Sequence, residues 1–252
     1  MKLQTKMAVV TGSGSGFGEG IAKLLAENGA TVVVADINPE GAARVAEEIE
    51  AARGQAYAAT VDVSRSESMA ALVRTVLDRS GRLDIFVNNA GISHKNSPLT
   101  EIDEATFDRV YAVNVKSIYL SALHVVPVFR RQGGGVFLNI ASTAGVRPRP
   151  GLTWYNGTKG AVITLTKSMA VELAPHNIRV NGLNPVAGDT PLLAQFLPGD
   201  DTPETRQKFI DTIPLGRLSR PADVARAALF LVSDEAEFIT GVCMEVDGGR
   251  CV

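Results

Sequence analysis

Near its start the chain reads Met7-Ala8-Val9-Val10-Thr11-Gly12-Ser13-Gly14-Ser15-Gly16-Phe17-Gly18. The first five residues are typical of a short buried strand, and a run of helical length follows from Gly16. Glycine lets the backbone approach a phosphate closely, and the first turn of a helix offers unpaired N–H groups. Because this turn joins a first strand to a first helix, it predicts a dinucleotide site; the alternative is a tight turn without a ligand. The residues expected to form the site are Gly12, Ser15, Gly16, Phe17 and Gly18.

The same succession of strand and helix continues along the chain. Val-, Ile- and Leu-rich runs of strand length alternate with amphipathic runs of helical length, which predicts repeated strand–helix–strand crossovers. The expected strands are 7–11, 31–35, 55–61, 85–88, 135–140, 178–183 and 242–246. The expected helices are 16–28, 39–52, 66–80, 103–131, 154–174 and 221–232. We therefore predict an α/β fold, a single-domain Rossmann fold whose doubly wound, seven-stranded parallel sheet carries helices on both faces.

Length and composition limit what the protein can be. The chain has 252 residues, 45% of them hydrophobic, and no linker or charge block divides it, so one domain over 1–252 is expected. A net charge of -2 gives no overall basic field, and the apolar stretches are short. We therefore expect a cytoplasmic protein without nucleic-acid or membrane partners. The two cysteines, Cys243 and Cys251, are expected to be free thiols, and no metal site is expected.

An acidic residue ends the second expected strand. Asp36 follows Gly18 by eighteen residues, the placement of a carboxylate that accepts hydrogen bonds from the adenosine ribose. Such a carboxylate repels a 2′-phosphate, and no Lys or Arg stands in the glycine-rich turn or in Ile37-Asn38-Pro39 to offset it. This pattern favours NAD(H) over NADP(H), with Ile37 beside Asp36. The alternative is that Asp36 only caps the next helix.

Two further strand ends are expected to meet the same cofactor, because ligands bind at the carboxyl ends of parallel strands. Asp62 with Val63 follows the third strand, where it can hold the adenine edge. Asn88-Asn89-Ala90-Gly91 follows the fourth, where small residues let the backbone lie against the cofactor. We expect contacts from Asn89, Ala90 and Gly91, although such a turn is by itself ordinary.

A group suited to proton transfer lies in the second half of the chain. Tyr155 and Lys159 are four residues apart at the start of an expected helix, so both can reach one site. A nearby ammonium favours the phenolate and makes the tyrosine a better base. Ser142 sits just past the fifth strand, thirteen residues before Tyr155, and can donate a hydrogen bond to a substrate oxygen. Asn114 lies in the long helix 103–131, where it serves either a buried structural hydrogen bond or a water relay.

These motifs, in this order and over essentially the whole chain, resemble the classical short-chain dehydrogenases/reductases. The resemblance implies a catalytic tetrad of Asn114, Ser142, Tyr155 and Lys159. Tyr155 would transfer the proton, Ser142 would position the substrate oxygen, Lys159 would hold the nicotinamide ribose, and Asn114 would help to hold a water. The resemblance further implies a homotetramer in which helices 103–131 and 154–174 pack across subunits, with the C-terminal tail near a neighbour's cleft.

Two positions depart from the family pattern. Phe17 stands where Ile or Leu is usual, against the pyrophosphate and nicotinamide ribose. After the sixth strand the family usually has Pro-Gly, whereas this chain has Pro185-Val186-Ala187-Gly188-Asp189-Thr190. By position, Pro185, Gly188 and Thr190 are expected at the nicotinamide carboxamide, with the Val186 side chain close by.

Three segments, 92–98, 143–154 and 191–214, are expected to surround the substrate. In the third, Leu192 and Phe196 precede Gly199-Asp200-Asp201, a pattern that resembles a lid over about 190–214; the alternative is a surface helical hairpin. Arg147 and Arg149 follow the Ser142 loop, where they bind an anionic substrate group or, alternatively, are solvated or contact another subunit. Trp154 either lines the pocket or only packs.

The resemblance thus implies an NAD(H)-dependent enzyme that interconverts a secondary alcohol and a ketone, with small-molecule substrates. Residues 1–140 would form the cofactor half, and residues 141–252 the catalytic and substrate half. One alternative is an NADPH-dependent 3-oxoacyl-acyl-carrier-protein reductase, which Asp36 disfavours. A non-catalytic NAD-binding regulator is a second alternative, which the presence of Ser142, Tyr155 and Lys159 disfavours.

Overall fold

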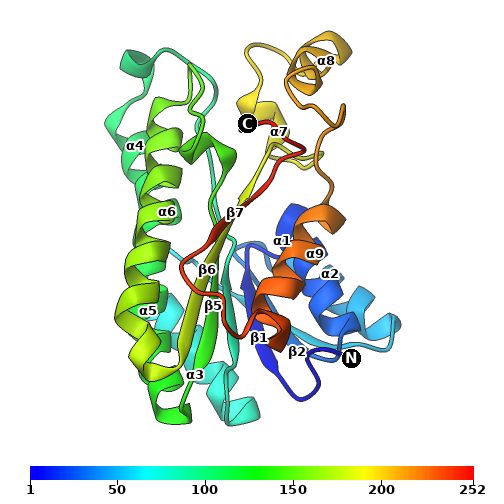
Figure 1. The fold of residues 1–252 in the computed structure, drawn as a ribbon, viewed down its shortest axis with the longest axis vertical. Helices are drawn as coiled ribbons and strands as arrows, with labels where there is room; N and C mark the ends of the chain where they lie inside the picture. Colours follow the sequence, from blue (N-terminus) through cyan, green and yellow to red (C-terminus); the bar gives the residue numbers. More distant parts are fainter.

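All 252 residues are described by a computed structural model (Figure 1). The seven strands form one parallel sheet in the order β3-β2-β1-β4-β5-β6-β7, which confirms the predicted fold. Their order reverses between β1 and β4, the place where such sheets bind their ligands. The strands are β1 (Met7–Thr11), β2 (Thr31–Asp36), β3 (Gln55–Thr60), β4 (Ile85–Asn88), β5 (Gly135–Ile140), β6 (Ile178–Pro185) and β7 (Cys243–Val246).

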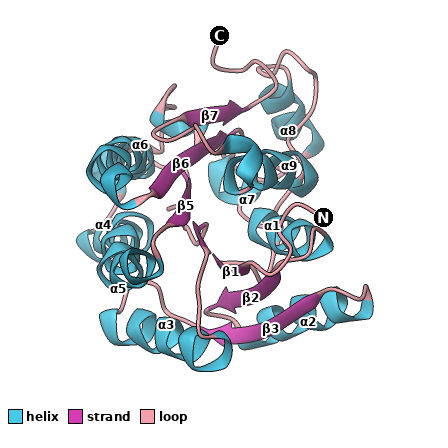
Figure 2. Cartoon of the chain, turned by 60° about the horizontal axis from the view of Figure 1, so that its bottom comes forward, coloured by secondary structure: helices cyan, strands magenta, loops and turns pink.

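Helices cover both faces of the sheet (Figure 2). Alternate strand residues point to opposite faces, so Ala8 and Val10 enter one apolar core while Met7 and Val9 enter the other. The first core is completed by α1 (Gly16–Glu27), α2 (Pro39–Ala51) and α9 (Pro221–Val232). The second is completed by α3 (Ser66–Ser80), α5 (Ser117–Gln132) and α6 (Thr153–Leu173). The strands are therefore buried on both sides, which is why their sequences are almost continuously apolar.

The helix expected over 103–131 is not a single α-helix. It consists of α4 (Glu104–Tyr111), a π-helical turn over Ala112–Lys116, and α5. A π-turn widens the helix by one residue, and such turns occur mostly at functional sites. The continuous helical segment Glu104–Gln132 has the length and hydropathy of a membrane span. This differs from our expectation that all apolar stretches are short. The segment nevertheless packs on α3, β4 and β5 as a core helix does.

Two short helices lie between β6 and α9, in the segment expected to resemble a lid. They are α7 (Leu193–Phe196) and α8 (Pro203–Ile210). Thr202 caps α8 by accepting a hydrogen bond from the Thr205 N–H, and the Arg206 guanidinium pairs with the Asp201 carboxylate. Figure 1 shows both helices at the end of the molecule to which the C-terminal tail returns.

Candidate active site

A cavity of about 780 Å³ lies at the carboxyl ends of the strands, under α7. It brings together nearly all of the predicted site residues. Those that line it are Gly12, Ser15, Gly16, Phe17, Asp36, Ile37, Asp62, Val63, Asn89, Ala90, Gly91, Ser142, Arg149, Tyr155, Lys159, Pro185, Gly188, Thr190, Leu192 and Phe196. The predicted residues outside its lining are Gly18, Asn114, Arg147 and Trp154. The sequence reasoning missed three polar wall residues, namely Ser64, Asp108 and Arg109, while Gln195 belongs to the segment 191–214 that was expected to surround the substrate.

The glycine-rich turn fits a pyrophosphate. Ser15 is the N-cap of α1 but its side chain makes no capping hydrogen bond, so N–H groups of the first turn stay free for a ligand. Gly18 does not face the cavity, because it serves the packing of the turn itself. A Cβ atom at Gly18 would lie 2.3 Å from the Gly12 carbonyl oxygen and 2.4 Å from the Asn89 side-chain nitrogen.

Asp36 is held at the cavity wall by backbone groups. Its Oδ2 accepts a hydrogen bond from the Gly14 N–H (2.8 Å), and its Oδ1 accepts one from the Asn38 N–H (2.9 Å). The N-cap of α2 is Asn38 and not Asp36, so the alternative that Asp36 only caps this helix does not hold. The nearby Arg44 guanidinium, which sequence reasoning overlooked, pairs with Glu19 and Glu48 and is therefore already neutralised. The cavity wall at Asp36 therefore suits an adenosine ribose without a 2′-phosphate, as in NAD(H).

Asp36→Ala is expected to raise the ratio of kcat/KM with NADP⁺ to kcat/KM with NAD⁺ by about tenfold, because it removes a like-charge repulsion of about 1 kcal/mol or more. Initial rates with each cofactor at saturating substrate test this. The matched control is Asp62→Ala, a second carboxylate of the same cavity that should weaken both cofactors alike. An unchanged ratio in the Asp36 variant would show that this carboxylate does not select the cofactor.

The remaining residues expected to bind the cofactor lie at the ends of β3 and β4. Asp62 Oδ1 accepts hydrogen bonds from the Ser64 N–H (2.9 Å) and hydroxyl (2.6 Å), which fixes the loop after β3. The Asn89 side chain donates to the carbonyl oxygens of Thr11 and Gly12, both at 2.9 Å. Asn89 thereby ties the loop after β4 to the glycine-rich turn, so both sides of the cofactor cavity form one unit.

Tyr155, Ser142 and Lys159 meet at the end of β5. The Ser142 hydroxyl oxygen accepts a hydrogen bond from the Ala144 N–H (3.0 Å), and the hydroxyl donates a long one to the Pro185 carbonyl oxygen (3.5 Å). Lys159 Nζ donates to the Ile140 carbonyl oxygen (2.9 Å) and lies 5.8 Å from the centre of the Tyr155 ring. All three face the cavity. The geometry gathers a phenol, a hydroxyl and an ammonium at one cavity wall, a group of side chains suited to proton transfer.

Burial sets the acid–base character of this group. It raises the pKa of Tyr155 to about 12, against the opposing effects of the Ser142 hydrogen bond and of the Arg149 charge. Burial also lowers the pKa of Lys159 to about 8. Both groups therefore hold their charge less readily than in water, and the charge of a neighbour or of a bound cofactor has a large effect on them.

Asn114 lies in the π-turn, behind the cavity. Its Oδ1 accepts from the Ile92 N–H (2.9 Å), and its Nδ2 donates to the Ile92 carbonyl (2.8 Å) and to the Thr158 hydroxyl (3.0 Å). It therefore joins the loop after β4 to α6, between Tyr155 and Lys159. Of the two readings of Asn114, these contacts favour the structural one.

Phe17 and Gly188 lie in direct contact at the cavity wall. A Cβ atom at Gly188 would lie 2.5 Å from Phe17 Cζ and 3.0 Å from the Ser219 carbonyl oxygen. The bulky residue at 17 and the displaced glycine at 188 are thus two sides of one contact. Val186 lies at the cavity wall, as its position after Pro185 suggested.

The two arginines after the Ser142 loop point in different directions. Arg149 lines the cavity, with its guanidinium 5.5 Å from the Phe196 ring centre and 4.7 Å from that of Phe209. It forms no ion pair, and burial followed by the charge of Arg250 lowers its pKa to about 10. Arg147 instead donates to the Arg250 carbonyl oxygen and stands outside the cavity lining.

Trp154 packs rather than lining the cavity. Its ring meets Phe107 edge-on at 5.4 Å, and its N–H donates to the Leu99 carbonyl (3.1 Å). The aromatic residue that packs against Tyr155 is instead Phe196, whose ring centre lies 5.2 Å from that of Tyr155. Leu192 lies on the same wall. Arg147 and Trp154 are therefore removed from the set of expected substrate contacts.

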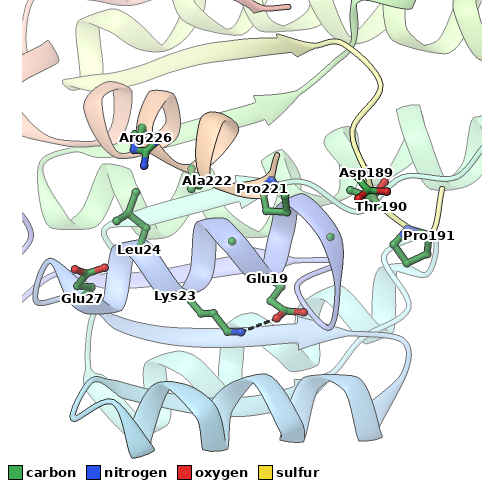
Figure 3. A pocket seen from close by; sticks show the side chains of 13 residues that line it. Glu19, Lys23, Leu24, Glu27, Asp189, Thr190, Pro191, Pro221, Ala222 and Arg226 are labelled. Atoms are coloured by element: carbon green, nitrogen blue, oxygen red, sulfur yellow. Dashed lines mark hydrogen bonds and ion pairs between the residues drawn. The ribbon is translucent and has the colours of Figure 1, made fainter. Parts of the chain in front are cut away.

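A second cavity, of about 530 Å³, lies between α1 and α9 (Figure 3). It adjoins the first at Gly16, Thr190 and Pro191, which line both. The Lys23 ammonium on its wall is paired with Glu19 and Glu48. No member of the predicted tetrad reaches this second cavity.

A Rossmann sheet, a cradle for NAD(H) and a tyrosine–lysine–serine group at one cavity define a dinucleotide-dependent oxidoreductase. Residues 12–250 match the family model described as enoyl-(acyl carrier protein) reductase. The chain is 52% identical over 250 residues to 4-formylbenzenesulfonate dehydrogenase of Comamonas testosteroni, covering 99% of each chain. It is 39% identical over 244 residues to cis-4-hydroxycyclohexanecarboxylate dehydrogenase of Sinomonas cyclohexanicum, covering 97% of this chain and 96% of that protein.

A solved structure of similar sequence is 3-ketoacyl-(acyl-carrier-protein) reductase from Brucella melitensis in complex with NADH. It is 48% identical, with a TM-score of 0.93, and the match covers 99% of this chain and 100% of that one. The chain belongs to the short-chain dehydrogenase/reductase family. It is an NAD(H)-dependent oxidoreductase acting on CH–OH groups, which confirms the expected reaction class and cofactor.

Proposed function

We propose that the protein interconverts, with NAD(H), an alcohol and a carbonyl carried on an apolar ring that also bears an anionic group. The observation that carries this proposal is Arg149, a half-buried guanidinium without an ion-pair partner on the wall of the catalytic cavity. An unpaired cation in such a place is costly unless a ligand supplies the opposite charge. A guanidinium pairs well with a sulfonate or a carboxylate.

The names of two relatives support this substrate class. 4-Formylbenzenesulfonate is an aromatic aldehyde with a sulfonate, and cis-4-hydroxycyclohexanecarboxylate is a ring alcohol with a carboxylate. The apolar walls beside Tyr155, formed by Phe196, Leu192 and Val186, suit such a ring.

The residues at the cavity would share the chemistry as follows. Tyr155 takes the alcohol proton during oxidation and returns it to the carbonyl oxygen during reduction, while Ser142 holds that oxygen. The bound nicotinamide accepts or supplies the hydride. Lys159 holds the nicotinamide ribose and, as an ammonium, favours the phenolate of Tyr155. Asn114 keeps α6 and the loop after β4 together. The segment 190–214 acts as a lid over the ring, above the cofactor half 1–140.

We also propose a homotetramer in the cytoplasm. Large apolar side chains stand exposed on the outer faces of α5 and α6, among them Tyr119 (61% exposed) and Val171 (80% exposed). Burial of these faces against other copies of the chain would explain their composition.

A substrate screen tests the proposed function. Purified protein is assayed with NAD⁺ and NADP⁺ on benzyl alcohol, cyclohexanol and their 4-carboxylate and 4-sulfonate derivatives, and with NADH and NADPH on an acetoacetyl thioester. We expect turnover with NAD⁺ and a higher kcat/KM for the anionic alcohols. Reduction of the thioester alone, driven by NADPH, would instead support the 3-oxoacyl-acyl-carrier-protein reductase alternative.

Arg149→Met is expected to lower kcat/KM for the anionic alcohols by about ten- to a hundredfold, because it removes a charge-assisted hydrogen bond, and to change the neutral alcohols little. The same assay on matched neutral and anionic rings measures both effects. Arg130→Met, at an exposed arginine in the last turn of α5, is the control. Equal losses on neutral and anionic rings would remove Arg149 as the anion partner.

A further inference from the structure

The C-terminal tail, residues 247–252, is fastened to the chain that follows α8. The Gly248 carbonyl oxygen accepts a hydrogen bond from the Leu215 N–H (3.1 Å). The Asp247 carboxylate folds the tail back on itself, because it accepts hydrogen bonds from the N–H groups of Gly249 (2.9 Å) and Cys251 (2.7 Å). Figure 1 shows the end of the chain beside α7, at the lid end of the molecule. The tail is therefore joined to the chain immediately after the lid segment, and Arg250 also reaches Thr212 within it.

Arg250 is the side chain that the tail inserts under the lid. It is only 6% exposed, and its Nε donates to the Thr212 hydroxyl (3.1 Å). Its guanidinium lies 5.3 Å from the centre of the Phe209 ring on α8. Its carbonyl oxygen accepts from the Arg147 guanidinium. Arg250 forms no ion pair, and the hydrogen bonds to both oxygens of the nearby Asp247 come from the backbone.

Phe209 connects Arg250 to the catalytic cavity. Arg149, which lines the cavity, lies over the same ring at 4.7 Å, so the two guanidinium carbons are at most about 10 Å apart. Arg250 is buried and Arg149 is half-buried, and neither has a salt-bridge partner. Two like charges held this close in a poorly hydrated place repel each other, and a bound anion relieves that repulsion.

We propose that Arg250 is a second specificity-determining residue for an anionic substrate, acting by its charge and by holding Phe209 and Arg149 in position. The inference rests on the proposed function, since it concerns the same substrate group. Arg250 is a positioning residue and not a catalytic one, because it stands behind Phe209 and outside the cavity lining.

Two variants separate the effect of the Arg250 charge from the effect of its packing. Arg250→Gln removes the charge, and Arg250→Lys keeps it. KM and kcat are measured for benzyl alcohol and for its 4-sulfonate with NAD⁺. We expect Arg250→Gln to raise KM for the sulfonate about three- to tenfold, with kcat and the KM for benzyl alcohol within about twofold. Arg250→Lys should restore most of the loss, and in an Arg149→Met background Arg250→Gln should add little.

The outcomes distinguish this inference from the proposed function. If the unaltered protein shows no preference for the sulfonate, the proposed function fails, and the inference fails with it. If it prefers the sulfonate and Arg250→Gln keeps that preference, or changes both alcohols equally, only the inference fails. Thermal unfolding and NADH binding of each variant establish that it is folded. Should Arg250→Gln not fold, Arg250→Met, which also removes the charge, takes its place beside Arg250→Lys. Sulfonate preference lost in Arg250→Met but kept in Arg250→Lys supports the inference, and preference kept in both or lost in both overturns it.

Discussion

Tyr155→Phe is expected to lower kcat for alcohol oxidation by about 10²- to 10⁴-fold, the usual contribution of a positioned general base. The substitution removes one hydroxyl and leaves the ring in place against Phe196, at 5.2 Å between ring centres. NADH binding, followed by fluorescence titration, should stay within about twofold. Steady-state rates with NAD⁺ on the best substrate of the screen measure the loss.

Tyr111→Phe is the matched control for this prediction. Tyr111 stacks on Phe107 and its hydroxyl lies near Gly157 on α6, but it stands outside the cavity. Loss of this hydroxyl should leave kcat almost unchanged. If Tyr155→Phe kept a tenth or more of the activity, another group would have to move the proton, and the assigned role of Tyr155 would be wrong.

The pH dependence of oxidation follows from the same group. Burial raises the pKa of Tyr155 to about 12, so near neutral pH the phenol is protonated and only a small fraction is the phenolate that oxidation needs. The rate of oxidation should therefore rise with pH above neutrality. The Arg149 charge acts to lower the pKa of Tyr155, so Arg149→Met should move this rise to higher pH. No such movement would show that the two groups are not coupled.

Gly145→Ala is expected to lower kcat by about 10²-fold or more, since displacements of about 1 Å near reacting groups have effects of that size. Gly145 lets the loop after β5 touch the backbone of α6. A Cβ atom there would lie 2.7 Å from the Gly160 nitrogen and 2.8 Å from the Lys159 carbonyl oxygen. The added methyl group must push Ser142, which stands on this loop, away from Tyr155 and Lys159.

Gly160→Ala is the control for Gly145→Ala, because Gly160 lies on α6 opposite Gly145. Its nearest neighbour would be the Gly145 carbonyl oxygen at 4.0 Å, so a methyl group fits, and alanine is favoured within a helix. We expect this variant to keep its activity. Circular dichroism and NADH titration on both proteins separate a displaced site from an unfolded one. A folded Gly145→Ala with normal kcat would contradict the argument.

The fold and the cofactor side of the cavity were predictable because short-range patterns determine them. Strands buried on both faces have continuous apolar sequences, and residues that follow the strand ends necessarily gather at one edge of the sheet. The glycine-rich turn, Asp36 and Asn89 could be located in this way. The π-turn at Asn114 could not, because one extra residue in a helix barely disturbs the spacing of its apolar side chains.

The substrate side was less predictable, because distant contacts determine where its side chains point. Arg147 and Arg149 are equivalent in sequence, yet Arg147 is drawn to the tail, 103 residues away, while Arg149 faces the cavity. Trp154 is held by Phe107 and Leu99. The resemblance implied only that the C-terminal tail lies near a neighbour's cleft, and no sequence pattern predicted that Arg250 packs on Phe209 and Thr212 of its own chain.

The contact between Phe17 and Gly188 couples two positions that look like independent departures from the family pattern. With any side chain at 188, the Phe17 ring would have to shift, because a Cβ atom there falls 2.5 Å from its Cζ atom. A smaller residue at 17 would remove that obstacle, while the Ser219 carbonyl oxygen at 3.0 Å would still limit the space at 188. The effects of substitutions at 17 and 188 on stability are therefore expected to be non-additive.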